Sequence, residues 1–187
     1  MVRRKPSPAE RRERTAAIDD PEIVLAAALR FLETRQRSVA EVRRRLTIAG
    51  YQPELIDGAI ERLLALGILD DEAFTSAWVE SRDRARPRGE RALRRELQVK
   101  GVSRDVVDAA MGERRPEPGG DADPDVAAAE RLLARHASAL ARVADPRKRR
   151  QRAYGLLARN GFDPSTAADV VRAALAAPDA PDMPEDV

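Results

Sequence analysis

The amino-acid sequence predicts an all-α protein, an elongated array of three tandem three-helix repeats, and three observations support this prediction. Alanine, leucine, arginine and glutamate dominate the 187-residue chain, and all four favour helix. No run of β-branched residues is bounded by turn residues, as a strand would be. A motif of leucine, three residues, glycine and an apolar residue occurs three times, at 46–51, 97–102 and 157–162. Because a three-helix unit of about 45 residues buries little surface alone, the units are expected to stack in a row.

The first repeat is expected over residues 21–68, with helices over 21–34, 38–50 and 53–66. Pro21 suits the first position of a helix, where its missing N–H is not needed. Ser38 can act as the N-cap of the second helix. Gly50 can end that helix in the left-handed conformation.

The second and third repeats are expected over residues 69–111 and 126–177. In the second repeat, Asp70 and Ser103 can cap the first and last helices, and Gly101 can end the middle one. The expected helices are 70–85, 90–101 and 103–111 in the second repeat and 124–144, 146–160 and 164–176 in the third.

Three segments are expected to lie outside the repeats. Residues 1–20 are charged and lack an apolar face, which predicts a disordered N-terminal arm. Residues 112–125 contain prolines and a pair of glycines, which predict a linker. Residues 178–187 carry three prolines and four acids, which predict a disordered acidic tail.

The composition excludes several classes of site. With no cysteine, the chain can form no disulfide, cysteine metal site or thiol nucleophile. His136 is its one histidine, so no metal site with two or three histidines can form. The longest apolar runs have seven residues, far below the ~20 that span a bilayer. A soluble, cytoplasmic protein without a cofactor is therefore expected. Net charge is only +2, yet residues 81–111 carry +4 and residues 131–160 carry +8.

No motif for catalysis or nucleotide binding is found. The chain has neither a GxxxxGK[ST] nor a GxGxxG sequence. The acidic run 121–125 resembles the start of a calcium loop, but Val126 stands where that loop requires glycine. Three consecutive acids at 70–72 point in different directions from a helix start, which predicts capping rather than an ion site. The chain is therefore expected not to be an enzyme.

The concentration of arginine on the middle helices of the repeats calls for a physical explanation. At 100° per residue, four arginines at the start of the middle helix of the second repeat and just before it share an arc of about 120° away from its leucines. They are Arg88, Arg91, Arg94 and Arg95. Too few acids are available to pair with them, so an interaction surface is favoured over a solvated face. The planar fork of arginine suits phosphates and carboxylates. The predicted interaction residues are Arg43, Arg44, Arg82, Arg88, Arg91, Arg94, Arg95, Lys100, Arg147, Lys148, Arg149, Arg150 and Arg152.

Two other features allow a nucleic-acid interpretation but favour a structural one. Trp78 follows Phe74 by four residues, which predicts packing on one helix face; a stacking platform for a base is the alternative. The helix after each turn would read DNA in a helix–turn–helix protein. In the first repeat that helix, 53–66, carries three acids against one arginine, so it is a poor groove reader.

Three stretches of the chain resemble the RecX family of recombination regulators. They are LRFLETRQRSVAEVRRRL (29–46), LGILDDEAFTSAWVESR (66–82) and PRGERALRRELQVKGV (87–102). The second meets the family pattern LDDxxFA except that Thr75 replaces alanine. Residues 126–176 fit the third repeat of the family more loosely.

The resemblance implies a curved array of three-helix repeats that lies in the groove of RecA filaments on single-stranded DNA. It implies inhibition of ATP hydrolysis and strand exchange, DNA binding, and no catalytic residues. We therefore expect a non-enzymatic, monomeric regulator of RecA filaments that also binds single-stranded DNA and, more weakly, double-stranded DNA. Two alternatives stay open: a stand-alone nucleic-acid-binding helical module without a recombinase partner, and a purely structural scaffold.

Overall fold

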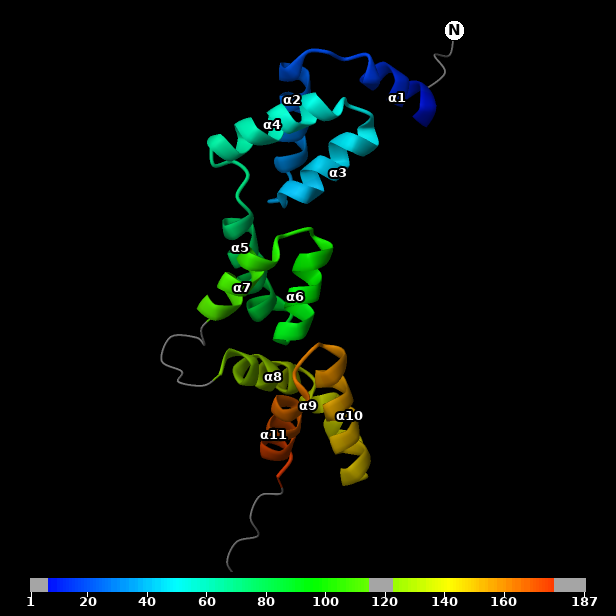
Figure 1. Ribbon diagram of the computed structural model, residues 1–187. Coiled ribbons are helices and arrows are strands. Elements are labelled where there is room, and N and C mark those ends of the chain that lie inside the picture. The colour runs from blue at the N-terminus through cyan, green and yellow to red at the C-terminus, as the bar shows by residue number, and fades with distance from the viewer. Residues whose placement is uncertain (1–6, 115–122, 177–187) are drawn as a thin grey trace, which may run out of the picture. The chain divides into compact units, whose positions relative to one another are not determined.

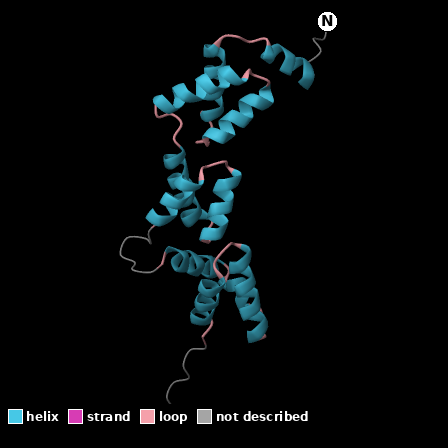
Figure 2. Ribbon diagram, viewed as in Figure 1, coloured by secondary structure: helices cyan, strands magenta, loops and turns pink. Residues whose placement is uncertain are grey.

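The fold is helical throughout the described chain (Figures 1 and 2). The computed structural model describes residues 7–114 and 123–176. Every regular element among these residues is a helix, which confirms the predicted all-α class. The helices are α1 (Pro8–Ala16), α2 (Pro21–Leu32), α3 (Val39–Ala49), α4 (Pro53–Ala65), α5 (Asp71–Ala85), α6 (Glu90–Val99), α7 (Arg104–Glu113), α8 (Pro124–Arg135), α9 (Ala137–Ala141), α10 (Pro146–Arg159) and α11 (Pro164–Ala174).

Short polar side chains fix the starts of these helices. Asp20, Ser38 and Asp163 each accept a hydrogen bond from a backbone N–H in the first turn of α2, α3 and α11. Eight of the nine expected helices are present as single helices, with ends within two residues of those expected. The order α2–α4, α5–α7 and α8–α11 is therefore the predicted tandem order, whereas the elongated, curved outline stays a prediction.

The expected disordered arm is wrong for residues 8–16, which form α1. The hydroxyl of Ser7 accepts the N–H of Glu10 at 3.2 Å, and the Glu10 carboxylate accepts the N–H of Ser7 at 2.6 Å. This reciprocal capping box satisfies two backbone donors and starts the helix. Arg12 Nε donates to the Ile48 carbonyl at 3.1 Å, so α1 is held against α3 by a contact that local sequence does not reveal.

The single helix expected over 124–144 is two helices, α8 and α9, that meet at His136. The N–H of His136 donates to the Leu133 carbonyl, three residues back, at 2.9 Å. The chain turns there, and Leu140 and Val143 are buried beyond the turn. Burial of these apolar side chains outweighs the uninterrupted hydrogen-bond ladder of one long helix.

The linker expected over 112–125 is shorter than predicted. Helix α7 continues to Glu113, and α8 begins at Pro124. The rest of that linker, residues 115–122, lies outside the described residues, as do residues 1–6 of the expected arm and all of the expected tail.

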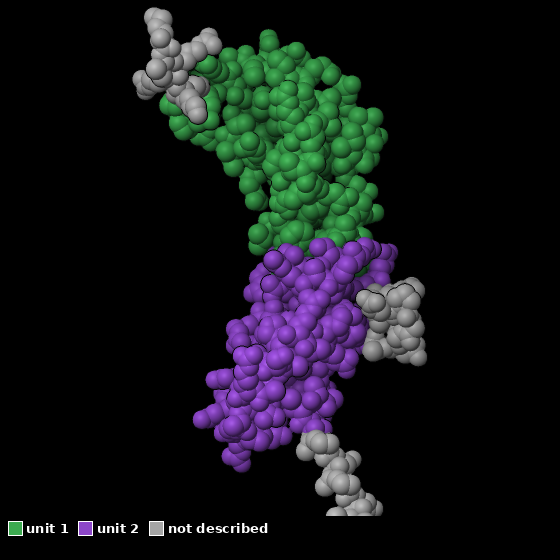
Figure 3. Space-filling view, turned by 180° about the vertical axis from the view of Figure 1, so that it is seen from behind, with its two compact units in different colours: residues 1–78, 96–110 green, residues 79–95, 111–187 purple. Residues whose placement is uncertain are grey.

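The chain divides into two compact units (Figure 3). Unit 1 is residues 1–78 and 96–110, and unit 2 is residues 79–95 and 111–187. Each unit has an aliphatic core that few aromatic side chains enter. The core of unit 1 lies among α2, α3 and α4; it includes Val24, Ala28, Val42, Leu46, Ile56, Ile60 and Leu63. The core of unit 2 lies among α8, α10 and α11; it includes Ala128, Ala129, Ala153, Leu157, Phe162, Ala167 and Val170.

Each unit contains one junction between consecutive repeats, and the two junctions use equivalent backbone contacts. In unit 1, the Val39 N–H at the start of α3 donates to Asp71 Oδ1 at 3.0 Å. In unit 2, the Glu90 N–H at the start of α6 donates to Asp125 Oδ2 at 3.0 Å. In both cases an acid at the start of the next repeat's first helix satisfies an orphan donor of the preceding middle helix.

The glycines of the repeated motif complete these junctions. Gly101 and Gly161 follow α6 and α10 with φ of +77° and +84°, a region that favours glycine. A Cβ at Gly101 would overlap Ala40, and a Cβ at Gly161 would overlap Ala92. The residue before Gly101 also contributes to its junction, because the Lys100 carbonyl accepts the Ser38 Oγ–H at 2.5 Å. The motif therefore lets one repeat approach the next closely.

Gly161→Ala is expected to destabilise the protein more than Gly67→Ala. Both glycines have positive φ, +84° and +65°, so alanine is strained by about 1 kcal/mol at either position. A Cβ at Gly161 would also overlap Ala92, which adds roughly 1–3 kcal/mol, whereas nothing lies within 4 Å of a Cβ at Gly67. Urea denaturation followed by circular dichroism measures both losses, and equal losses would contradict the close approach at this junction.

Candidate interaction surfaces

The thirteen predicted interaction residues have very different surroundings. Three of them are exposed or half-buried cations in ion pairs: Arg43 with Asp57, Arg91 with Asp163 at 2.8 Å, and Arg94 with Glu90 at 2.6 Å. Arg82 and Arg88 are half-buried and engaged in contacts. Arg44 and Arg95 are exposed and have no ion pair with any described residue. Some arginines of this stretch therefore have structural roles. The angular distribution of arginines on a single helix does not predict these roles, because it does not show their partners on other helices.

Lys100 belongs to the junction within unit 1. Its Nζ lies 2.7 Å from Glu41 Oε1 and 4.9 Å from the ring centroid of Trp78, and its side chain is only 18% exposed. Trp78 Nε1 in turn donates to Glu96 Oε2 at 3.0 Å. Trp78 also packs against the buried ring of Phe74, with centroids 5.9 Å apart. These contacts agree with the packing interpretation of Trp78 and place Lys100 in a structural role.

At this junction the pKa values of the Glu41 and Asp71 carboxyl groups shift in opposite directions. Burial alone would raise the pKa of Glu41, but the hydrogen bond and charge of Lys100 hold that pKa below its ordinary value. Burial raises the pKa of Asp71 despite the hydrogen bond that it accepts from Val39. Neighbouring Asp70 accepts the N–H groups of Glu72 and Ala73, which confirms that this acidic run caps α5.

The junction within unit 2 is organised by Arg114, which was expected to lie in the linker. Its side chain is 3% exposed, and its guanidinium donates to Asp83 at 2.7 and 3.0 Å and also to Asp125. Its Nη2 further donates to the Arg88 carbonyl at 3.2 Å. Burial alone would lower the pKa of Arg114, but hydrogen bonds and charge from Asp83 and Asp125 raise it. The matching acids at the starts of α5 and α8 are the sequence signal that could have indicated such a site.

Two of the three arginines of α6, Arg91 and Arg94, line a charged cleft within unit 2. The cleft has a volume of about 570 Å³, and its lining includes Arg91, Arg94, Arg114, Asp125 and Asp163. These cations already pair with acids inside the unit. Compensated charge of this kind offers an incoming anion little net attraction, so the cleft is a weaker candidate than an unpaired basic face.

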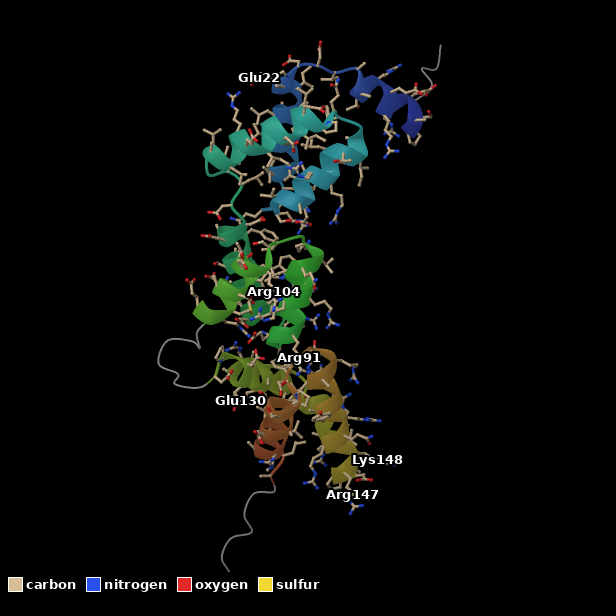
Figure 4. The ribbon with its side chains drawn as sticks, viewed as in Figure 1. Glu22, Arg91, Arg104, Glu130, Arg147 and Lys148 are labelled. Carbon is tan, nitrogen blue, oxygen red and sulfur yellow. The ribbon has the colours of Figure 1, made fainter. Side chains whose placement is uncertain are left out.

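An unpaired basic face lies on α10 (Figure 4). Arg147, Lys148, Arg150 and Arg152 are exposed and form no ion pair with any residue that the structure describes. Figure 4 labels Arg147 and Lys148. Arg149 is the exception, because it turns inward and its Nε donates to the Val143 carbonyl at 3.0 Å.

The charge of this face opposes the stability of its own helix. The first turn of α10 contains no acid, and Asp145 alone caps it by accepting the N–H groups of Arg147 and Lys148. Cations near a helix N-terminus interact unfavourably with the helix dipole. Exposed Arg159, on the same helix, extends the face and was missed, although its position in the helical pattern would have indicated it. That this face is an interaction surface stays a prediction, for which it is a stronger candidate than the cleft of unit 2.

Residues 7–114 and 123–176 contain neither a metal site of clustered acids or histidines nor a membrane-spanning helix. No group of three or more acids or histidines is placed to hold a metal ion. No helix there combines the length and the apolar composition needed to cross a bilayer.

Arg114→Met is expected to destabilise the protein by about 3 kcal/mol, because it leaves two partly buried carboxylates without their cation. Arg104→Met is the matched control. Arg104 is 91% exposed and pairs with Asp108, so its loss is expected to cost less than ~0.5 kcal/mol. Urea denaturation of both variants tests the difference. Similar small losses would show that the Arg114 network does not hold unit 2 together.

Comparison with known proteins identifies relatives along most of the chain. Models of the first and second three-helix domains of RecX match residues 25–63 and 70–111. The regulatory protein RecX of Mycolicibacterium vanbaalenii is 36% identical over 157 residues, covering 81% of this chain and 82% of the relative. The regulatory protein RecX of Mycobacterium bovis is 33% identical over 175 residues, covering 92% of each chain.

Two solved structures share the fold at 19% sequence identity. A crystal structure of a regulatory protein RecX has a TM-score of 0.68 and covers 80% of this chain and 72% of that one. The crystal structure of RecX from Lactobacillus salivarius has a TM-score of 0.66 and covers 83% and 96%. The matched three-helix domains, together with sequence identity over most of the length, show that the chain belongs to the RecX family of regulatory proteins.

Proposed function

We propose that this protein is a non-enzymatic regulator that binds RecA filaments on single-stranded DNA and inhibits RecA's ATP hydrolysis and strand exchange. The family supplies the regulatory role, and the resemblance of its motifs supplies RecA as the partner. The single structural observation that supports a DNA-bound target is the unpaired basic face of α10. The protein acts as a cytoplasmic monomer and requires no cofactor.

The charge of unit 2 supports a polyanionic target. Among its described residues, lysine and arginine outnumber aspartate and glutamate by eight. Phosphate backbones attract such surfaces by releasing condensed counterions, independently of base sequence. Arg147 and Lys148 project from the start of α10, where Figure 4 shows their side chains extending away from the helix. A single-stranded backbone can contact these residues without any change in the core of unit 2.

RecA ATP hydrolysis on single-stranded DNA, measured while this protein is titrated in, tests the proposed function. We expect inhibition well below one copy of this protein per RecA subunit, because a filament regulator acts on many subunits through few contacts. The RecA of the same organism is required. Absence of inhibition under those conditions would refute the proposal.

The basic face of α10 also favours a second candidate, a stand-alone nucleic-acid-binding module. In that case the protein would compete with RecA for the strand. Inhibition would need enough protein to cover the DNA, and excess single-stranded DNA would abolish it. The same ATP hydrolysis assay therefore separates the two functions.

Replacing Arg147, Lys148, Arg150 and Arg152 with glutamine is expected to weaken binding to single-stranded DNA. The slope of log affinity against log salt should become shallower by about three, because each lost phosphate contact contributes about 0.7. Fluorescence anisotropy at several salt concentrations measures the slope.

A matched control removes the same charge from paired, exposed sites. It replaces Arg62, Arg84, Arg104 and Arg172, which pair with Glu22, Glu80, Asp108 and Asp169. We expect this control to bind single-stranded DNA with nearly the wild-type slope. Equal changes in the two variants would mean that net charge, and not the face of α10, determines binding.

A further inference from the structure

Exposed apolar side chains are segregated between the two units. Eight large hydrophobic residues are substantially exposed among the described residues, and seven of them belong to unit 1. Tyr154 is the only one in unit 2. Charge is segregated in the opposite sense, because in the described part of unit 1 acids outnumber lysine and arginine by four. Unit 1 therefore presents apolar and acidic surface, which is suited to a protein and not to phosphate.

Three of the exposed aliphatic side chains lie at the end of α4 and in the turn between α4 and α5, which Figure 1 shows. Leu64, Leu66 and Ile68 are 44%, 61% and 47% exposed. Isolated exposed aliphatic residues are common on protein surfaces, but here three fall within five residues of the chain. We call these three side chains the apolar patch.

The turn that carries this patch is held by backbone hydrogen bonds. The Gly67 N–H donates to the Leu64 carbonyl at 2.9 Å, and the Ile68 N–H donates to the Leu63 carbonyl at 3.0 Å. Gly67 takes the positive φ of +65° that this reversal requires. Leu63 on one side and Leu69 on the other are buried. Leu66 and Ile68 are therefore presented by a hydrogen-bonded turn, and Leu64 by the last turn of α4, which reduces the entropy lost on binding.

The neighbouring residues have structural roles, but the patch has none. Asp70 caps α5, and Asp71 accepts the N–H of Val39 at the junction in unit 1. Leu66 and Ile68 lie four and two residues before Asp70 and contribute little burial to the core. The cores and caps of unit 1 therefore do not explain why two large aliphatic residues occupy this turn.

The charge around the patch indicates the class of its partner. Residues 63–81 contain four acids and no lysine or arginine. Exposed Glu61 lies three residues before Leu64, on the same side of α4. Acids on both sides of an apolar turn repel a phosphate backbone and favour an apolar surface with a cationic rim.

We propose that Leu64, Leu66 and Ile68 form the docking site for the protein partner, a RecA subunit of the filament, while α10 contacts the DNA. The proposal rests on the proposed function and assigns the two kinds of partner to different surfaces. Burial of the patch removes apolar area from water, and the acids around it align the partner's cations.

The test is a Leu66→Gln/Ile68→Gln double variant, measured for affinity to RecA filaments on single-stranded DNA and to the DNA alone. We expect filament affinity to fall by about tenfold or more, because two aliphatic side chains no longer lose contact with water on binding. Affinity for single-stranded DNA alone should not change. Both side chains are exposed, so circular dichroism and thermal unfolding should match the wild type.

Two control variants make the result specific. Ile48→Gln/Val99→Gln removes aliphatic side chains that are 55% and 68% exposed elsewhere in unit 1, and it should bind filaments normally. Leu66→Met/Ile68→Val keeps an apolar surface and should also bind normally. If the glutamine double variant binds filaments as tightly as the wild type, the docking site is elsewhere. If it loses affinity for DNA alone by the same factor, the division between the two surfaces is wrong.

These outcomes are distinct from failure of the proposed function. If the wild-type protein neither binds RecA filaments nor inhibits their ATP hydrolysis, the proposed function fails and the docking site with it. If the wild type inhibits and only the assignment to this turn fails, the function stands.

Discussion

The structure depends on a backbone N–H at the start of one repeat's middle helix and on the carboxylate that accepts it from the next repeat. Val39 donates to Asp71 in unit 1, and Glu90 donates to Asp125 in unit 2. Each carboxylate satisfies a donor that a helix start leaves without a partner. Because a small three-helix unit buries limited apolar area, these junctions and the glycines beside them are what join the repeats.

The acids at the two junctions determine which cations remain available to partners, because some lysine and arginine side chains pair with them. Lys100 and Arg114 neutralise acids at the two junctions, and Arg91 reaches Asp163 in the third repeat. An arginine-rich sequence is therefore not the same as a basic surface, because several of its charges are compensated inside the unit. The face of α10 differs because its first turn lacks an acid and its exposed cations have no ion pair with other described residues. Its charge is left for the solvent and for a partner.

The sequence predicts structural features that depend on neighbouring residues well. It predicts contacts between residues far apart in the chain poorly. Helix ends follow from caps such as Ser38 and Gly50, which act within a few residues. The capping box of α1, formed by Ser7 and Glu10, is also a local signal. The high charge of residues 1–20 nevertheless led to the expectation of a disordered arm. The role of Arg114 depends on Asp83, 31 residues away, and that of Arg88 on Asn160, 72 residues away. Pairings over such separations leave no periodic signal, so a helical pattern shows the direction of a side chain but not its partner.

Hydrogen–deuterium exchange of the full-length protein tests most directly whether the two units meet different partners. Slower exchange marks backbone that a partner orders or covers. We predict that single-stranded DNA alone slows exchange in α10 and leaves the α4–α5 turn unchanged, whereas RecA filaments on DNA slow exchange in both. Protection of the α4–α5 turn by DNA alone, or protection of α10 only by the filament, would contradict it.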